Sequence, residues 1–312
     1  MCDRILIIRP GALGDFILTL PVIAGLRELY PNAWIEVLAR GRTASLAEGI
    51  ADTTGNLDTC RPLAAGGGPS DYIGTFGLVI TWSSDSHSAY VPQGFGGEAV
   101  VLPAVPPDGV CASRFFFKSV PQLKGVEWEP PRVRLTSDEC ARADELLAAN
   151  RLGGGADVVA VHPGSGGRGK CWPAESFARV ISALLDAGRN VLMLQGEADA
   201  QAVADVRAEL GGDCVPVLRD LPLRTLAAAL SRCGRYLGND SGVSHLAAAV
   251  QVECVVLFGP TDPEVWAPQG RNVTVLAADL ECRPCGKTSP DCTDRRCLTD
   301  VTPGRVLAAM LK

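Results

Sequence analysis

Residues 238–250 read GNDSGVSHLAAAV and follow the short strand-like run 235–237. Asn239, Asp240 and Ser241 are the residue types that cap helices, because their side chains accept the unpaired N–H groups of a first turn. The alanine-rich residues after them predict a helix. Such a helix start carries partial positive charge and free N–H donors, which suit a phosphate or diphosphate. The stretch also fits an ordinary strand–loop–helix corner, so the neighbouring sequence must decide between these interpretations.

A second polar stretch, HPGSGGRGKCWP at 162–173, lies between a predicted strand at 158–161 and a helical pattern. Its four glycines and Ser165 offer N–H and O–H donors, and Lys170 adds a positive charge. It is not a Walker A loop, because Lys170 is followed by Cys171 rather than by Ser or Thr. We interpret the stretch as an anion-binding loop, since a purely structural loop has little need of so many glycines and a lysine.

Polar residues follow other predicted strands as well. Gly242 leaves the backbone of the 238–250 corner open to close approach, and His245 is placed one turn later to donate to an anion. Glu197 follows a strand and is positioned either to accept ribose hydroxyls or to sit in a first helical turn. Asp15 ends the turn RPGALGD at 9–15, where it presents a carboxylate or simply caps the next helix.

Strands and helices alternate along the chain, which predicts parallel sheets with helices on both faces. The alternation runs once before the glycine-rich stretch 151–156 and restarts after it. We therefore expect an α/β protein with two Rossmann-like domains, at residues 1–152 and 153–312, facing each other across a cleft. The last helix, predicted over 302–311, is a candidate to return to the first domain. Ligands of such sheets lie at the carboxyl ends of the strands, where all these motifs fall.

Two helix boundaries are predicted from local patterns. A helix is expected over 42–49, and another over 137–150. Ser137 is the predicted cap of the second helix, with Cys140 in the place of the Glu that would complete a capping box.

Composition excludes several classes of protein. The chain has 312 residues and a net charge of −6, with 47% hydrophobic and 21% charged residues, as in a soluble globular protein. It has no block of basic residues, which argues against nucleic-acid binding. Neither a signal peptide nor a run of about 18 apolar residues is recognised, so the sequence predicts a cytoplasmic protein.

The chain contains twelve cysteines, and in a protein of this class we expect reduced thiols rather than a disulfide framework. Eight are scattered singly and fit small core residues. The other four are clustered in a polar loop with spacing C-x2-C-x6-C-x4-C: Cys282, Cys285, Cys292 and Cys297. Four thiolates suit a structural Zn site, but the spacing is shorter than in zinc ribbons, so plain loop packing remains the alternative.

Four motifs occur in order through both predicted domains: Arg9, Gly14, Asp15 and Pro21; HPGS…K-x-WP at 162–173; GNDSGVSH at 238–245; and LFGPTDP at 257–263. Together they resemble the ADP-heptose:lipopolysaccharide heptosyltransferases of glycosyltransferase family 9. The resemblance implies a GT-B fold and an inverting transfer of a sugar from a nucleotide-diphosphate donor.

The resemblance also implies roles for individual residues. Asp15 takes the position of the general base, which removes the proton of the acceptor hydroxyl. The donor side is expected to comprise Ser165, Arg168, Lys170, Glu197, Asp240, Ser241, Gly242 and His245. Within this set Lys170 meets the diphosphate, Glu197 the ribose and Asp240 the sugar hydroxyls. Arg168, in a glycine-rich run where several members carry hydroxyl and acidic residues, is expected to add a phosphate contact.

Charged residues and a missing motif indicate the acceptor and the cofactors. Arg114, Lys118 and Lys124 lie in the Pro- and aromatic-rich loop 103–131, where they are placed to meet an acidic, lipid-linked glycan and the inner face of the inner membrane. The chain has no D-x-D pair, and fixed donors can neutralise a diphosphate, so no cofactor or catalytic metal is expected beyond the donor, ADP-heptose. The alternatives are a GT-B nucleotide-sugar epimerase or hydrolase, and a non-catalytic nucleotide-sugar-binding protein.

Overall fold

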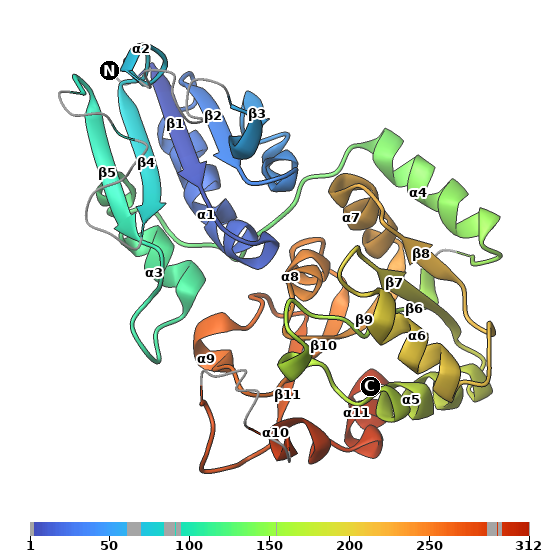
Figure 1. The fold of residues 1–312 in the computed structure, drawn as a ribbon. Helices are drawn as coiled ribbons and strands as arrows, with labels where there is room; N and C mark the ends of the chain where they lie inside the picture. The colour runs from blue at the N-terminus through green and yellow to red at the C-terminus, as the bar shows by residue number, and fades with distance from the viewer. Residues whose placement is uncertain are drawn as a thin grey trace. The chain divides into compact units, whose positions relative to one another are not determined.

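The computed structural model describes residues 3–60, 70–83, 91, 95–153, 155–285, 292 and 295–311. The chain separates into two compact units, Met1–Arg134 and Leu135–Lys312 (Figure 1). Each unit contains one parallel sheet covered by helices, so the predicted α/β class with two Rossmann-like units is confirmed. No helix in the described ranges is both long enough and apolar enough to cross a membrane.

The first unit is built on a five-stranded sheet with the order β3-β2-β1-β4-β5. Its strands are β1 (Arg4–Arg9), β2 (Trp34–Ala39), β3 (Thr53–Asn56), β4 (Leu78–Ser83) and β5 (Glu98–Pro103). Its helices are α1 (Leu13–Leu29), α2 (Ser70–Ile73) and α3 (Ala112–Lys118), with 3-10 turns η1 (Thr43–Ala47), η2 (Leu57–Thr59) and η3 (Pro121–Leu123). Ile5 to Ile8 of β1 are fully buried, as expected for a central parallel strand that is covered on both faces.

The second unit has a six-stranded sheet with the order β11-β10-β9-β6-β7-β8. Its strands are β6 (Gly155–His162), β7 (Asn190–Gln195), β8 (Val217–Arg219), β9 (Cys233–Asn239), β10 (Glu253–Phe258) and β11 (Val273–Ala277). Its helical elements are α4 (Ser137–Ala149), η4 (Arg168–Lys170), α5 (Ala174–Asp186), α6 (Ala200–Glu209), α7 (Leu223–Ser231), α8 (Gly242–Ala249), α9 (Pro263–Trp266), α10 (Arg296–Thr299) and α11 (Pro303–Met310).

Two helical layers cover the second sheet. One core joins Val159, Val161 and Leu237 of the strands to residues of α5, α6 and α11. Because successive strand residues face opposite sides, Ala160 and Leu192 point to the other face. There α7 and α8 pack on β9, and α4 packs on α7.

The structure differs from the sequence prediction in several elements. The predicted helix over 42–49 is the 3-10 turn η1, and the short strands β3 and β11 were not predicted. The cap of α4 is Thr136 rather than Ser137, and Glu139 completes its capping box. Glu139 therefore replaces Cys140 as the third helical residue of the box.

The ends of the second unit also differ from expectation. The compact units divide between Arg134 and Leu135, whereas the sequence placed the boundary at 152. The reason is α4, which packs on α7 and so belongs to the second unit. The final helix α11 was a candidate to return to the first unit, but it packs on α5, with Val306 and Met310 in the core of its own unit.

Candidate functional site

The strand order places the candidate site of the second unit. Strands β6 and β9 are neighbours from which the chain continues in opposite directions across the sheet. Ligands of open parallel sheets bind beyond the carboxyl ends of the strands at such a reversal point. Strand β6 ends at His162 and β9 at Asn239, so the loops 163–173 and 240–241 begin at this position.

Asp240 is the centre of this site. Its carboxylate Oδ2 accepts hydrogen bonds from Lys170 Nζ at 2.8 Å and from Thr261 Oγ1 at 2.6 Å. Its backbone carbonyl accepts from Ser165 Oγ at 2.7 Å. Asp240 is buried, whereas 27% of the Lys170 side chain is exposed, so the ammonium group can reach a ligand. Two loops distant in sequence, those of Lys170 and Thr261, therefore meet at the carboxylate of Asp240.

Asn239 fixes the loop that carries Lys170. Its Oδ1 accepts from the N–H of Trp172 at 3.0 Å, and its Nδ2 donates to the carbonyls of Pro163 and Gly164. The side chain is fully buried, and its amide replaces the backbone pairing that the irregular loop lacks. The sequence identified Asn239 only as a cap-type residue.

A buried chain of hydrogen bonds runs beneath the site. His162 Nε2 lies 2.9 Å from Asp199 Oδ2, and its Nδ1 lies 3.4 Å from Ser241 Oγ. Burial raises the pKa of Asp199, but hydrogen bonds from His162 and from the Gly196 N–H outweigh burial and hold that pKa below its usual range. The ionised carboxylate then accepts, which places a proton on Nε2 of His162. The sequence did not select His162 or Asp199, although Asp199 stands at a typical cap position.

The first turn of α8 follows Asp240 directly and forms part of the site. Ser241 is the N-cap and accepts from the N–H of Ser244, as its residue type predicts. Gly242 is the first helical residue, and His245 is buried one turn later. The helix dipole and the unpaired N–H groups favour an anion in front of this end.

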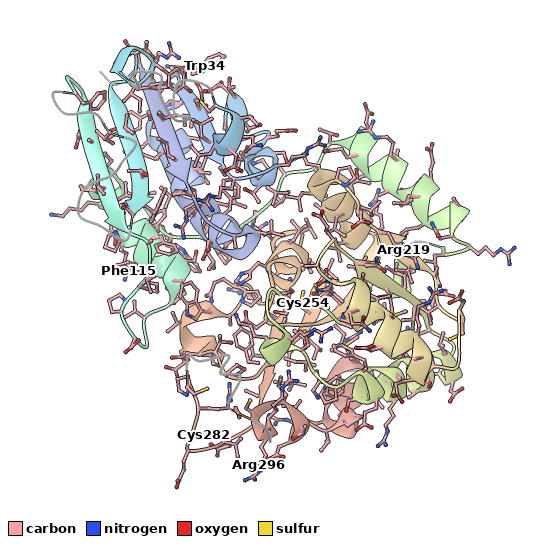
Figure 2. All side chains as sticks on the ribbon, in the orientation of Figure 1. Trp34, Phe115, Arg219, Cys254, Cys282 and Arg296 are labelled. Atoms are coloured by element: carbon pink, nitrogen blue, oxygen red, sulfur yellow. The ribbon has the colours of Figure 1, made fainter. Side chains whose placement is uncertain are left out.

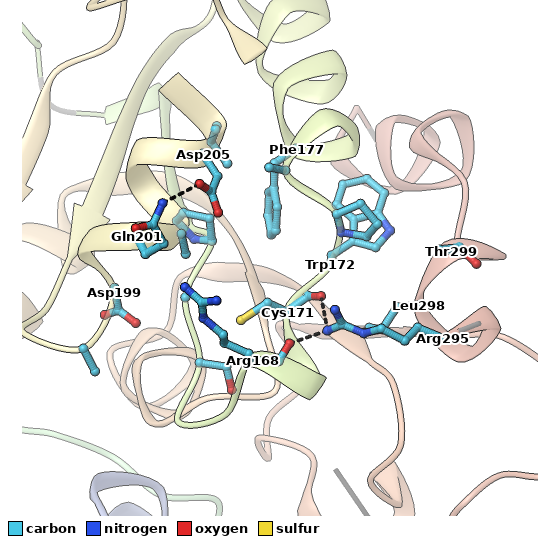
Figure 3. Close-up of a pocket in the computed structure, with 18 residues that line it drawn as sticks. Arg168, Cys171, Trp172, Phe177, Asp199, Gln201, Asp205, Arg295, Leu298 and Thr299 are labelled. Carbon is cyan, nitrogen blue, oxygen red and sulfur yellow. Dashed lines mark hydrogen bonds between the residues drawn. The ribbon is translucent and has the colours of Figure 1, made fainter. Parts of the chain in front are cut away.

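The remaining donor-side candidates are exposed residues on two loops of the second unit. Glu197 is exposed on the loop between β7 and α6, next along the sheet from β6. Arg168 is exposed on η4. Its side chain lines a pocket of about 300 Å³ between the loop 163–173 and helices α5, α6 and α10, which Asp199, Asp205 and Arg295 also line (Figure 3).

The first unit places Asp15 at its own reversal point, between β1 and β4. Asp15 Oδ2 accepts from the N–H of Ala12 at 3.0 Å, so the carboxylate does cap α1. Its Oδ1 lies 3.8 Å from Nη2 of Arg9, which is buried between the rings of Trp82 and Phe116. Burial lowers the pKa of Arg9, and the negative charge of Asp15 opposes this shift. One carboxylate oxygen thus caps α1, and the other faces a buried cation.

The three candidate acceptor-side cations are all exposed on the first unit. Arg114 and Lys118 lie on α3, within the stretch that the sequence treated as a loop, and Lys124 follows η3. The guanidinium of Arg114 lies 3.8 Å from the ring centroid of Trp128, which keeps its position defined.

The sequence left the clustered cysteines either as a structural Zn site or as plain loop packing. No group of three or more His, Cys, Asp or Glu side chains in the described ranges is arranged to hold a metal. Cys282, Cys285 and Cys292 are exposed, and the Cys285 thiol faces the carbonyl of Pro260. Burial raises the pKa of the Cys297 thiol, and the positive charge of Arg283 opposes this upward shift.

Similarity to known proteins extends over both units of the chain. Residues 114–292, more than half of the chain, match the family model of glycosyltransferase family 9 (heptosyltransferase). Lipooligosaccharide heptosyltransferase 2 of Campylobacter jejuni is 27% identical over 161 residues, which is 50% of each protein, so the match spans about half of that relative. Lipooligosaccharide heptosyltransferase 2 of Haemophilus influenzae is 24% identical over 97% of each chain.

Solved structures agree on the fold. The ADP-heptose lps heptosyltransferase II of E. coli superimposes with a TM-score of 0.76 at 20% identity, covering 99% of this chain and 98% of the other. At that identity the likeness shows the fold, which is the GT-B arrangement predicted from the motifs. With more than half of its length matched by the family model, the chain belongs to glycosyltransferase family 9, the heptosyltransferase family.

Proposed function

We propose that the protein transfers a sugar, a heptose carried by ADP, to an acceptor of the lipopolysaccharide core type, with inversion at the anomeric carbon. The observation that carries the proposal is the convergence of Lys170, Thr261 and Ser165 on Asp240 in front of the first turn of α8. A carboxylate, an ammonium group and a helix N-terminus suit a ligand that is half sugar and half diphosphate. Family membership supports the sugar and the donor.

The donor side of the mechanism uses the second unit. Asp240 accepts hydrogen bonds from the sugar hydroxyls, while Lys170 and the N–H groups at Gly242 face the diphosphate. As the bond between the anomeric carbon and the phosphate oxygen breaks, negative charge grows on the leaving ADP, and these fixed donors stabilise it. Glu197 accepts the ribose hydroxyls, Arg168 adds a phosphate contact, and His245 supports the helix start. This charge neutralisation requires no metal.

The acceptor side uses the first unit. Oδ1 of Asp15, which pairs with Arg9 and is not used by the Ala12 N–H, takes the proton of the acceptor hydroxyl, whose oxygen forms the new bond to the anomeric carbon. Arg114, Lys118 and Lys124 offer exposed positive charge to an acidic acceptor, and a lipid-linked acceptor would bring them to the inner face of the inner membrane.

A binding experiment followed by an activity assay tests the proposal. In a thermal-shift measurement with ADP, UDP, GDP and CDP, we expect ADP to raise the unfolding midpoint most, equally with and without EDTA. Asp15→Asn should keep this shift, since an amide oxygen still caps α1, yet lower kcat for sugar transfer by roughly 10²–10⁴-fold. An EDTA-sensitive shift would contradict metal independence, and a kcat within a few-fold of the wild type would contradict the base.

Product analysis separates the alternatives. The proposal predicts a glycosylated acceptor with inverted anomeric configuration, measured by NMR of the product. Free sugar or an epimerised nucleotide sugar, formed equally without acceptor, would indicate the hydrolase or epimerase. ADP binding without any turnover would indicate a non-catalytic binding protein.

A further inference from the structure

Three residues of the cysteine-bearing segment, Arg283, Cys285 and Arg295, contact both loops that meet at Asp240. On one side, Arg283 donates from Nε to the carbonyl of Gly259 at 2.5 Å and from Nη2 to the carbonyl of Thr261 at 3.4 Å. Between these two carbonyls, the carbonyl of Pro260 accepts from the N–H of Cys285 at 3.1 Å. Three consecutive carbonyls of the loop 259–261 are thus satisfied from this segment.

On the other side, Arg295 contacts the lysine-bearing loop. Its Nη2 donates to the carbonyls of Arg168 and Cys171, which flank Lys170, the second of these bonds at 3.4 Å (Figure 3). The remaining atoms of Arg295 line the pocket behind the loop 163–173. The guanidinium is therefore bound to the backbone of the loop.

Both anchored loops deliver a side chain to the same oxygen. Thr261 Oγ1 and Lys170 Nζ both donate to Asp240 Oδ2. Neither loop has the sheet pairing that would fix its path, and each carbonyl needs a donor. An arginine presents several N–H donors in a rigid plane, so one side chain can hold two carbonyls in a defined relation.

We propose that Arg283 and Arg295 are positioning residues for the diphosphate of the donor, an inference that rests on the proposed function. They touch no substrate. Together with the Cys285 backbone they form a clasp, defined as Arg283, Cys285 and Arg295, that holds the loops 259–261 and 168–171 on either side of Asp240. The clasp holds Lys170 and Thr261 in fixed positions relative to each other. The diphosphate therefore binds to a site that is already assembled, and binding costs less conformational entropy of the loops.

The role predicts a nucleotide-dependent effect. ADP carries the second phosphate that Lys170 is proposed to meet, whereas AMP lacks it. Loss of one clasp arginine should therefore weaken ADP binding selectively, while general damage to the unit would weaken ADP and AMP alike. Lysine in place of Arg283 keeps the charge, but its single nitrogen cannot reproduce the bonds that Nε, Nη1 and Nη2 of Arg283 make to the carbonyls of Gly259, Ala278 and Thr261. This variant therefore separates positioning from simple electrostatic attraction.

The experiment measures Kd for ADP and for AMP by isothermal titration calorimetry with the full chain. For Arg295→Met and Arg283→Met we expect Kd for ADP to rise roughly tenfold, as for the loss of one or two hydrogen bonds, with Kd for AMP within about twofold. Arg283→Lys should behave like Arg283→Met. The matched control is Arg296→Met, because Arg296 is 60% exposed, lies at the outer surface of the unit (Figure 2) and pairs with Asp300 in the next turn.

Three results would overturn the clasp: unchanged ADP affinity in both methionine variants, an equal loss for ADP and AMP, or full recovery in Arg283→Lys. If one methionine variant fails to fold, judged by its unfolding midpoint, the lysine variant and the other arginine still decide. A wild-type protein that binds no ADP would instead overturn the proposed donor, and the clasp with it. The two failures are therefore distinguishable.

Discussion

At the scale of single residues, the close approach of Asp199 to Gly164 decides the shape of the loop 163–173. A Cβ atom at Gly164 would lie 1.9 Å from Asp199 Oδ1, which no side chain tolerates. Asp199 is in turn held by His162 and by the N–H of Gly196. Glycine at this position is therefore required by packing, not by an unusual backbone angle.

Gly164→Ala should consequently damage both the fold of the second unit and the donor site. The new methyl group must displace Asp199, which breaks its hydrogen bond to His162 and leaves buried polar groups unsatisfied, at a cost of about 1–3 kcal/mol or more. We expect a lower unfolding midpoint and weaker ADP binding, measured by calorimetry and titration. Gly166→Ala is the matched control, since a Cβ there meets no atom within 4 Å. Equal behaviour of the two variants would contradict this account.

At the scale of elements, an ion pair attaches α4 to α7. Arg224 binds Glu139 through Nε and Nη2, and both side chains are mostly buried. The hydrogen bonds from Arg224 lower the pKa of Glu139 from 4.5 to about 2, although burial opposes this shift. Because α4 is the first helix of the second unit, this pair attaches the beginning of that unit to α7.

The lowered pKa predicts how stability depends on pH. The carboxylate of Glu139 binds a proton less readily in the folded protein than in the unfolded chain. The contribution of the ion pair to the free energy of unfolding is therefore complete above pH 4.5 and is lost as the pH falls toward 2. Glu139→Gln should lower the free energy of unfolding at pH 7 by at most about 3 kcal/mol, which appears as a lower unfolding midpoint. The difference in midpoint between this variant and the wild type should vanish near pH 2. Thermal unfolding followed by circular dichroism at several pH values measures this.

The same helix provides the control for that measurement. Asp144 pairs with Arg232 in the same unit, but the two side chains are 54% and 36% exposed, so solvent screens the pair. Asp144→Asn should change the midpoint little at any pH. A midpoint difference for Glu139→Gln that persists unchanged at pH 2 would show that the carboxylate charge is not what stabilises α4.

The same elements show what local sequence can predict. The order of strands and helices and the cap at Ser241 follow from hydrophobic period and cap chemistry, which are local. At α4 the sequence offers two adjacent caps, and Thr136 is selected because Glu139 both closes its capping box and meets Arg224. Strand β3 reads TTGN and lacks a strand signal of its own; it exists because β2 pairs with it.

The residues of the candidate site also divide into those that a local motif identifies and those that only the fold identifies. Lys170 and Asp240 could be selected from their motifs, but their contact joins positions 70 residues apart in sequence. Arg295 contacts the carbonyl of Arg168 across 127 residues, and nothing in either local pattern indicates it. Residues that contact backbone carbonyls carry no motif, because any loop sequence offers a carbonyl. Only the fold identifies them.

At the scale of the whole molecule, the two units place their polar residues at the same position of the sheet, and these residues are proposed to serve different chemistry. Each places its polar residues at the point where the sheet order reverses: Arg9 and Asp15 in the first unit, and His162 and Asp240 in the second. Every group proposed to bind the nucleotide and diphosphate lies in Leu135–Lys312. Binding of ADP and supply of the base are therefore assigned to separate compact units.

This division predicts which amides a nucleotide protects. With saturating ADP, hydrogen–deuterium exchange read by mass spectrometry should slow in peptides covering 162–171, 238–246 and 259–261, because the ligand stabilises only states in which these loops are closed around it. Exchange in residues 3–60 should stay unchanged. Lys170→Met at the same ADP concentration should lose most of the protection, while Lys118→Met, an exposed lysine of the first unit, should retain it. Protection centred on residues 9–30 instead would move the nucleotide to the first unit and exchange the assigned roles of the two units.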